Sequence, residues 1–267
     1  MIKTVHLFIV LVLLFPGFSQ AKSTDIQGNK LPDKTKPTDQ PAQQPPHRLS
    51  QWLTYYYKTP HSDRDIEYIT EIFQIGLFNA SNSTPMTMFL AEFFRQNEGR
   101  IPSWEKQLQQ IPQTEDQILL RSLWQANTKE TLKVLAHWPD TNTGKIIEQV
   151  KQTPPIDLKT TNVDSPEILD MLWATFFASG NPFYVERIIG VLDLPTDTGQ
   201  KQTRIKNMLL VGAAKWSLSS NAVQHELVHE TCERFTDSDN PLISKAIAEI
   251  LERAKAIKAQ KNEQDKD

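Results

Sequence analysis

The sequence has a single cysteine, Cys232, and only nine glycines in 267 residues. One cysteine cannot form an internal disulfide, and it excludes cysteine-rich zinc modules and C-x-x-C redox chemistry. The glycines nowhere spell G-x-G-x-x-G or G-x-S-x-G, so nucleotide binding and a hydrolase nucleophile elbow have no support. No segment alternates apolar and polar residues between turn signals, as a β-hairpin does. These absences favour a helical fold that is stabilised by a packed core.

A surplus of positive charge is also missing. The chain has 29 lysines and arginines against 32 aspartates and glutamates, a formal net charge of −3. Proteins that bind nucleic acid normally present a basic face to the phosphates. We therefore expect no nucleic-acid partner.

The first 21 residues have the layout of a cleavable secretory signal. Lys3 supplies the positive charge, residues 5–15 form a nearly unbroken apolar run, and Pro16 ends it. Ser19 and Ala21 are small residues at the two positions that a signal peptidase reads. The alternative is an uncleaved anchor, because the run is only slightly shorter than the ~20 residues of a spanning helix. The sequence predicts an exported chain, periplasmic or secreted, that does not stay in the membrane after cleavage.

Composition divides the rest of the chain into three parts. Residues 22–47 contain five prolines and no aromatic residue, and they predict a disordered linker because they can bury little apolar surface. Residues 48–260 have helical periodicity throughout and predict one all-helical domain, whose last helix covers about residues 241–259. Residues 261–267 are charged and predict a disordered tail.

Four segments of the domain share one pattern. Each is an apolar helix that ends in a large aromatic residue, then a short polar turn, then a second amphipathic segment. The segments are 86–108, 117–138, 169–192 and 209–228, with Phe94, Trp124, Phe177 and Trp216 as the aromatic residues. In the fourth copy, Trp216 is the expected packing anchor and Asn221 the expected turn.

This pattern predicts an all-α fold of stacked helical hairpins. One arrangement is an α-solenoid-like array, in which each hairpin buries its face on the next one along the chain. The other is an irregular helical array, because the repeat length varies and residues 140–162 interrupt it.

The fourth copy also contains His225-Glu226-Leu227-Val228-His229. On a helix, H-E-x-x-H places two imidazoles one turn apart to bind Zn²⁺, and the glutamate acts as general base for the bound water. Glu249 follows His229 by twenty residues and is a candidate third ligand. This spacing resembles that of the gluzincin metallopeptidases, in which a downstream glutamate completes the zinc site.

The sequence departs from the gluzincin pattern in two respects. The residues after Glu249 are Ile-Leu-Glu-Arg, in place of a Ser-Asp-like pair that orients the first histidine. The motif helix also has no predicted strand beside it. A helical wheel puts both histidines at the edge of the apolar half, which suits an ordinary solvated helix equally well. The sequence therefore assigns no catalytic, cofactor or metal residue in its main reading. The alternative reading has His225, His229 and Glu249 as zinc ligands and Glu226 as base.

Two stretches resemble a family of exported bacterial helical proteins that has no established activity. They are LWATFFASGNPFYVERII at residues 172–189 and GAAKWSLSSNAVQH at residues 212–225. The resemblance covers roughly residues 48–235 and implies the fold and export. With the helical pattern, it predicts a non-enzymatic interaction or scaffold module of the cell envelope, whose partner is another protein. The alternative is the small zinc metallopeptidase.

Overall fold

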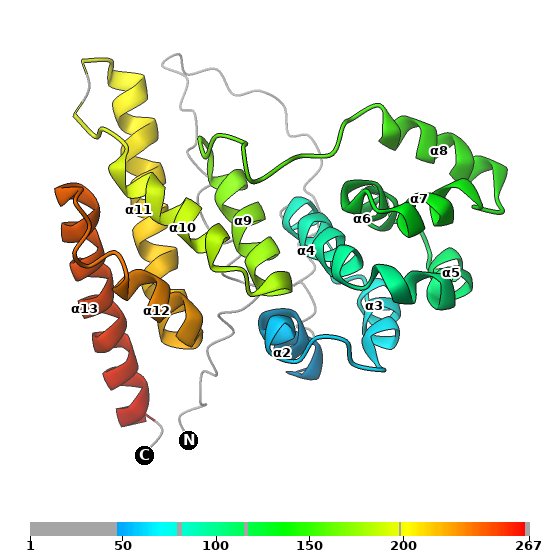
Figure 1. Ribbon diagram of the computed structural model, residues 1–267, viewed down its shortest axis with the longest axis horizontal. Coiled ribbons are helices and arrows are strands. Elements are labelled where there is room, and N and C mark those ends of the chain that lie inside the picture. The colour runs from blue at the N-terminus through cyan, green and yellow to red at the C-terminus, as the bar shows by residue number, and fades with distance from the viewer. Residues whose placement is uncertain (1–46, 79–81, 115–116, 198, 265–267) are drawn as a thin grey trace, which may run out of the picture.

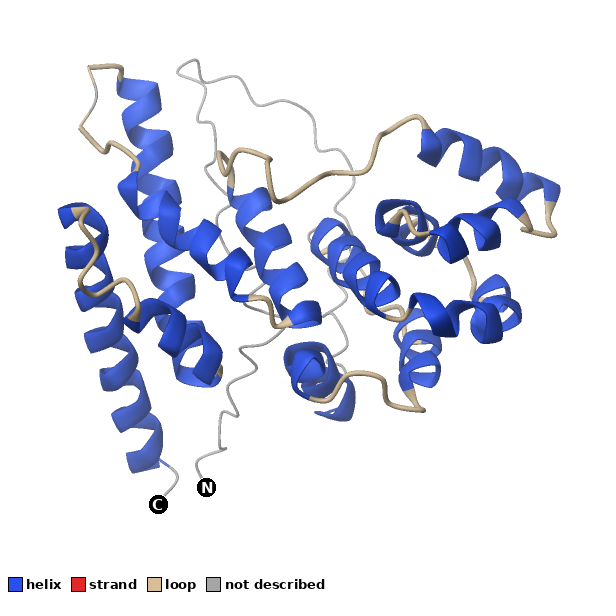
Figure 2. Cartoon of the chain, viewed as in Figure 1, coloured by secondary structure: helices blue, strands red, loops and turns tan. Residues whose placement is uncertain are grey.

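The computed structural model describes residues 47–78, 82–114, 117–197 and 199–264. All regular structure in these ranges is helical, as Figure 2 shows, so the all-α prediction is confirmed. The predicted signal, the linker up to residue 46 and the last three tail residues lie outside these ranges. Of the helices that are described, none is long and apolar enough to cross a bilayer.

The N-terminal part of the domain is α2 (His47–Tyr55), the 3-10 helix η1 (Tyr56–Lys58) and α3 (Asp65–Gln74). Leu49, Trp52 and Leu53 form the buried face of α2. The Trp52 indole N–H donates to the fully buried carboxylate of Asp65 over 3.1 Å, and Arg100 binds the same carboxylate over 3.0 Å. These contacts attach α2 and the start of α3 to the rest of the core.

Four helix pairs follow, and the first three have their turns where the sequence pattern predicts them. They are α4 (Ser83–Gln96) with α5 (Ile101–Gln110), α6 (Ile118–Ala126) with α7 (Lys129–Ala136), α9 (Pro166–Ser179) with α10 (Pro182–Gly190), and α11 (Lys201–Gln224) with α12 (Glu226–Glu233). The side chains of Thr128, Ser165 and Asn181 accept hydrogen bonds from first-turn amides and so begin α7, α9 and α10.

The pairs do not follow one another in space as they do in the chain. Helix α4 lies between α6 and α9, and these are its most extensive contacts (Figure 1). It can take a neighbour on two sides because buried residues occupy almost its whole circumference, from Met86 to Phe94. The second and third pairs therefore both pack on the first. The domain is thus an irregular helical array and not an α-solenoid-like one.

Two details of the helices differ from the expectation. Residues 140–162 interrupt the series of pairs, but they contain one helix that the sequence pattern does not predict, α8 (Thr141–Lys151), which begins where Asp140 accepts the Thr143 N–H over 2.7 Å. The last helix, α13 (Pro241–Gln264), continues past residue 259, so residues 261–264 of the expected tail are helical. Its buried residues Ala246, Ile247, Ile250 and Ala254 face the core, and α11 is its main neighbour.

The expected anchor and turn of the fourth pair were also wrong. Trp216 is 39% exposed, and Asn221 lies inside α11. The Asn221 side chain donates to the Ser217 carbonyl of its own helix over 3.0 Å, so it does not cap the helix end. Since Leu218 and Ala222 continue the buried face beyond Trp216, the helix runs on and the turn falls at His225.

Candidate functional site

The H-E-x-x-H segment lies across the junction of two helices. His225 ends α11, where its N–H donates to the Asn221 carbonyl over 2.8 Å. It is also the N-cap of α12, since its carbonyl accepts from the backbone N–H groups of Val228 and His229 over 3.0 and 3.1 Å. The expectation that both histidines share one helix face was therefore wrong.

The His225 ring is fully buried among four aromatic rings. We call this cluster the aromatic junction; it consists of His225, Tyr55, Tyr57, Phe176 and Phe177. Phe177 stacks on the imidazole with 5.1 Å between ring centroids, and Nδ1 shares a hydrogen bond of 3.1 Å with the Tyr57 hydroxyl. Nε2 is buried and has no hydrogen-bond partner in the described part of the chain. The junction joins the α11–α12 turn to α2, η1 and α9.

Burial decides the protonation of this cluster. Burial, with a smaller contribution from the nearby charge of Lys58, lowers the pKa of His225 to about 3. It also raises the pKa of Tyr57 to about 12. Both side chains are therefore neutral near pH 7, and the Tyr57 hydroxyl can donate to the imidazole. The His225 ring is buried and neutral, and its Nδ1 is hydrogen-bonded to Tyr57. It therefore packs as part of the core.

Gly180 lets the Tyr57 ring lie directly against the backbone. It has a φ of +64°, in the left-handed region, and ends α9. A Cβ at this position would lie 2.7 Å from Cδ2 of Tyr57. The two stretches that carry the family resemblance thus meet here, because Phe176, Phe177 and Gly180 come from one and His225 from the other.

The other candidate zinc residues point elsewhere. The His229 side chain is 43% exposed and lies 3.4 Å from the carboxylate of Glu233, on its own helix. Glu249 of α13 accepts from the Lys215 ammonium over 2.7 Å, and this bond lowers the pKa of Glu249. Glu226 is exposed in the first turn of α12. The structure does not bring these side chains to a common point, and the described ranges hold no group of three or more such ligands that could bind a metal ion.

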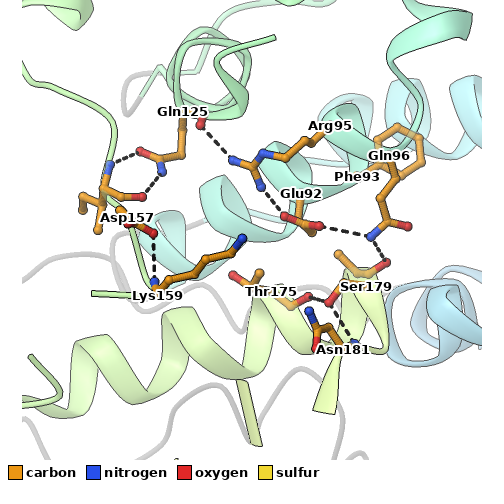
Figure 3. Close-up of polar contacts among 12 residues, drawn as sticks. Glu92, Phe93, Arg95, Gln96, Gln125, Asp157, Lys159, Thr175, Ser179 and Asn181 are labelled. Atoms are coloured by element: carbon orange, nitrogen blue, oxygen red, sulfur yellow. Dashed lines mark hydrogen bonds and ion pairs between the residues drawn. The ribbon is translucent and has the colours of Figure 1, made fainter. Parts of the chain in front are cut away.

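A second polar cluster lies where α4, α6 and α9 meet, and Figure 3 shows it. The carboxylate of Glu92 is buried, forms an ion pair with Arg95 and accepts from the Gln96 amide over 3.3 Å. Arg95 donates to the Gln125 carbonyl over 3.1 Å, and Gln96 donates to the Ala178 carbonyl over 3.1 Å. These bonds connect α4 to both of its neighbours.

Side chains also hold the irregular segment between α8 and α9. The Gln125 amide donates to the Ile156 carbonyl over 2.7 Å and accepts from the Ile156 N–H over 2.8 Å (Figure 3). Trp124 donates to the Thr153 carbonyl over 2.7 Å, and Arg187 donates to the Lys159 carbonyl over 2.9 Å. The sequence pattern did not predict this network. Its one visible sign is Glu92, which interrupts an otherwise apolar run.

A surface groove of about 730 Å³ lies between α3 and α5. Isoleucines 66, 75 and 111 line its apolar part, and glutamines 74, 107 and 110 line its polar part. Its two carboxylates are neutralised, since Glu67 pairs with Arg64 and Glu71 with Arg48. The groove has the composition of ordinary helix surface.

The most unusual surface is on α11. Four large apolar side chains are exposed on it: Ile205 (46%), Met208 (55%), Leu209 (46%) and Trp216 (39%). We call these four residues the α11 apolar face. Their spacing places them along one side of the helix, opposite the buried Leu210, Ala214 and Leu218. In Figure 1 the first half of α11 extends beyond α9 and α13. This face is therefore available to a binding partner.

No protein-family model matches this chain, and no curated protein or solved structure is detectably similar to it.

Proposed function

We propose that this chain is an exported, non-enzymatic interaction module of the cell envelope, and that it binds another protein through the α11 apolar face. The observation that carries the proposal is the pair of opposite apolar faces on α11. One of them packs on α12 and α13, and the other is exposed.

A helix at the surface of a domain needs only one apolar face to be stable. Single exposed apolar residues are common and need no explanation. The four residues of the α11 apolar face are different because they are aligned over a length of about 16 Å. Aligned exposed apolar residues on one surface mark interaction sites, and tryptophan and methionine are enriched in them.

Two further features support the rest of the proposal. The layout of residues 1–21 supports export. The buried polar atoms of the aromatic junction and of the Glu92 network are used to hold helices together, which suits a scaffold. A stable helical array with one exposed docking face is a common design for binding proteins.

Site-specific photo-crosslinking in the producing cells tests the binding claim. A photoreactive amino acid in place of Met208 is expected to give a covalent adduct with another protein. The same amino acid in place of Ile156, which is 37% exposed on the α8–α9 segment, is the control and is expected to give none. Absence of a protein adduct at position 208, or equal adducts at both positions, would contradict the proposal.

Cell fractionation with N-terminal sequencing tests the export claim separately. The chain is expected outside the cytoplasm, with residue 22 as its first residue. A cytoplasmic chain that begins at Met1 would refute the export claim and leave the binding claim standing.

A further inference from the structure

Positive charge surrounds the α11 apolar face. Helix α11 contains Lys201, Arg204, Lys206 and Lys215 and has no acidic residue. Helical spacing places Lys201 one turn before Ile205, in line with the apolar face, and Arg204 one turn before Met208. The apolar face is therefore bordered by cations at its N-terminal end and along its sides.

The four cations of α11 differ in their ion pairs. Lys206 lies 3.6 Å from the carboxylate of Asp164, and Lys215 lies 2.7 Å from that of Glu249. Lys201 and Arg204 are exposed and form no ion pair with any residue that the structure describes. A partner that buries the N-terminal half of this face would have to neutralise both of them. The charge pattern thus favours an acidic partner.

Gly212 lies in the middle of the same face, between Leu209 and Trp216. A glycine inside a helix is destabilising relative to alanine, because it loses more backbone freedom on folding. Nothing in the described part of the chain requires a glycine here, since a Cβ at this position would meet no heavy atom within 4 Å outside the backbone of its own helix and its two chain neighbours. Gly212 leaves a notch in the apolar face, through which another backbone can approach α11 closely.

We infer that the binding partner presents an amphipathic helix whose apolar side is flanked by aspartates or glutamates, and that this helix lies across Gly212. The inference rests on the proposed function and specifies the chemistry of the partner. An extended strand fits less well, because the backbone groups of α11 are used within the helix and present no sheet edge. A second copy packed through the same face fits less well, because its α11 has no acidic residue that could neutralise Lys201 and Arg204.

Two synthetic peptides of about 21 residues test the inference with the full mature chain. Both have the same leucine stripe at helical spacing; one is flanked by glutamates and the other by lysines. Fluorescence anisotropy at about 50 mM salt, where charge effects are large, is expected to show that the acidic peptide binds at least about tenfold more tightly. Equal affinities, or no binding of the acidic peptide, would overturn the inference.

Variants of the chain locate the binding. The double variant Lys201→Glu with Arg204→Glu is expected to reverse the preference between the peptides. Gly212→Leu is expected to lower the affinity for the acidic peptide by about tenfold, because the added side chain fills the notch. Leu242→Glu, at an exposed apolar residue of α13, is the matched control and is expected to change nothing. Circular dichroism confirms that each variant is folded.

Two further measurements separate the competing explanations. Binding to phosphatidylglycerol vesicles without binding to the acidic peptide would identify a membrane surface and overturn the inference. A dimer in sedimentation that dissociates in Met208→Glu would identify a second copy and overturn it as well. If position 208 crosslinks to a protein in cells while the two peptides bind equally, the inference fails and the proposed function stands.

Discussion

Acidification should remove the stability that one side chain, His225, contributes. The imidazole is fully buried, and burial together with Lys58 holds its pKa at about 3, whereas an exposed histidine titrates near 6.5. The unfolded chain can therefore take up a proton that the folded chain cannot accept. Because the folded-state pKa is lowered, the full stability is present above about pH 6.5 and is lost progressively as the pH falls toward 3.

The size of the effect follows from proton linkage. At pH 5 the unfolded imidazole is almost fully protonated and the folded one is not, so the contribution of His225 to the free energy of unfolding falls by about 2 kcal/mol. The limiting loss near pH 3 is about 5 kcal/mol. Either value is a large part of the 5–15 kcal/mol that is typical of a folded domain.

Urea denaturation at several pH values between 7.5 and 5.0 measures this effect. His225→Phe keeps a ring that can stack on Phe177 and cannot take up a proton. Its loss of the Tyr57 hydrogen bond lowers the stability by a similar amount at every pH in this window, so the slope against pH is the informative quantity. The wild-type protein should lose about 2 kcal/mol more than the variant between pH 7.5 and 5.0.

The control is Leu242→Gln, which alters an exposed residue that has no titratable group and should keep the wild-type slope. Parallel curves for the wild-type protein and His225→Phe would refute the reasoning. They would mean that the protonated imidazole is accommodated in the aromatic junction at little cost.

Three other predictions concern Gly180, Gln125 and Asp170, a partly buried residue of α9. Gly180→Ala should destabilise the protein by about 2 to 4 kcal/mol, because the added Cβ would clash with Tyr57. Gly76→Ala, at a similar positive φ in open space, should destabilise it by only about 1 kcal/mol. Equal losses of stability in thermal unfolding would show that the contact with Tyr57 does not matter. Asp170→Asn should stabilise the protein increasingly as the pH rises from 4 to 8, because burial raises the pKa of Asp170 to about 8 in the folded protein, whereas the unfolded carboxyl ionises at much lower pH. Parallel curves of unfolding free energy against pH for the wild-type protein and the variant would contradict this. Gln125→Ala should speed hydrogen exchange at the Ile156 amide by about tenfold or more, whereas Gln149→Ala, at an exposed residue of α8, should not.

Much of the helical architecture can be predicted from the sequence because its causes are local. The apolar spacing in residues 86–94 and 169–178 needs only the helical period to be recognised. The turns follow from short-range chemistry, as at Gly180 and Asn181, where a left-handed residue ends one helix and a side chain begins the next. Helix α8 was missed because the polar residues 140–162 hide a helix that begins at the cap of Asp140.

The roles of single residues in the fourth pair depended on contacts that the sequence does not display. Trp216 and Leu218 both belong to an apolar helix, and only the packing of α12 and α13 decided that Trp216 is exposed and Leu218 buried. His225 has the same local pattern as a zinc ligand at a helix edge. Its ring became part of the core because Tyr57 and Phe177, about 170 and 50 residues away in the chain, pack around it.

Most of the helices can be placed from the sequence, since helix periods and caps are properties of neighbouring residues. The tertiary structure alone decided the order in which the pairs stack and which faces remain exposed. Helix α4 is apolar almost all round and could accept neighbours on two sides, so local patterns did not specify which helices these would be. The α11 apolar face, on which the proposed function depends, is visible only once the opposite face of the same helix is known to be buried.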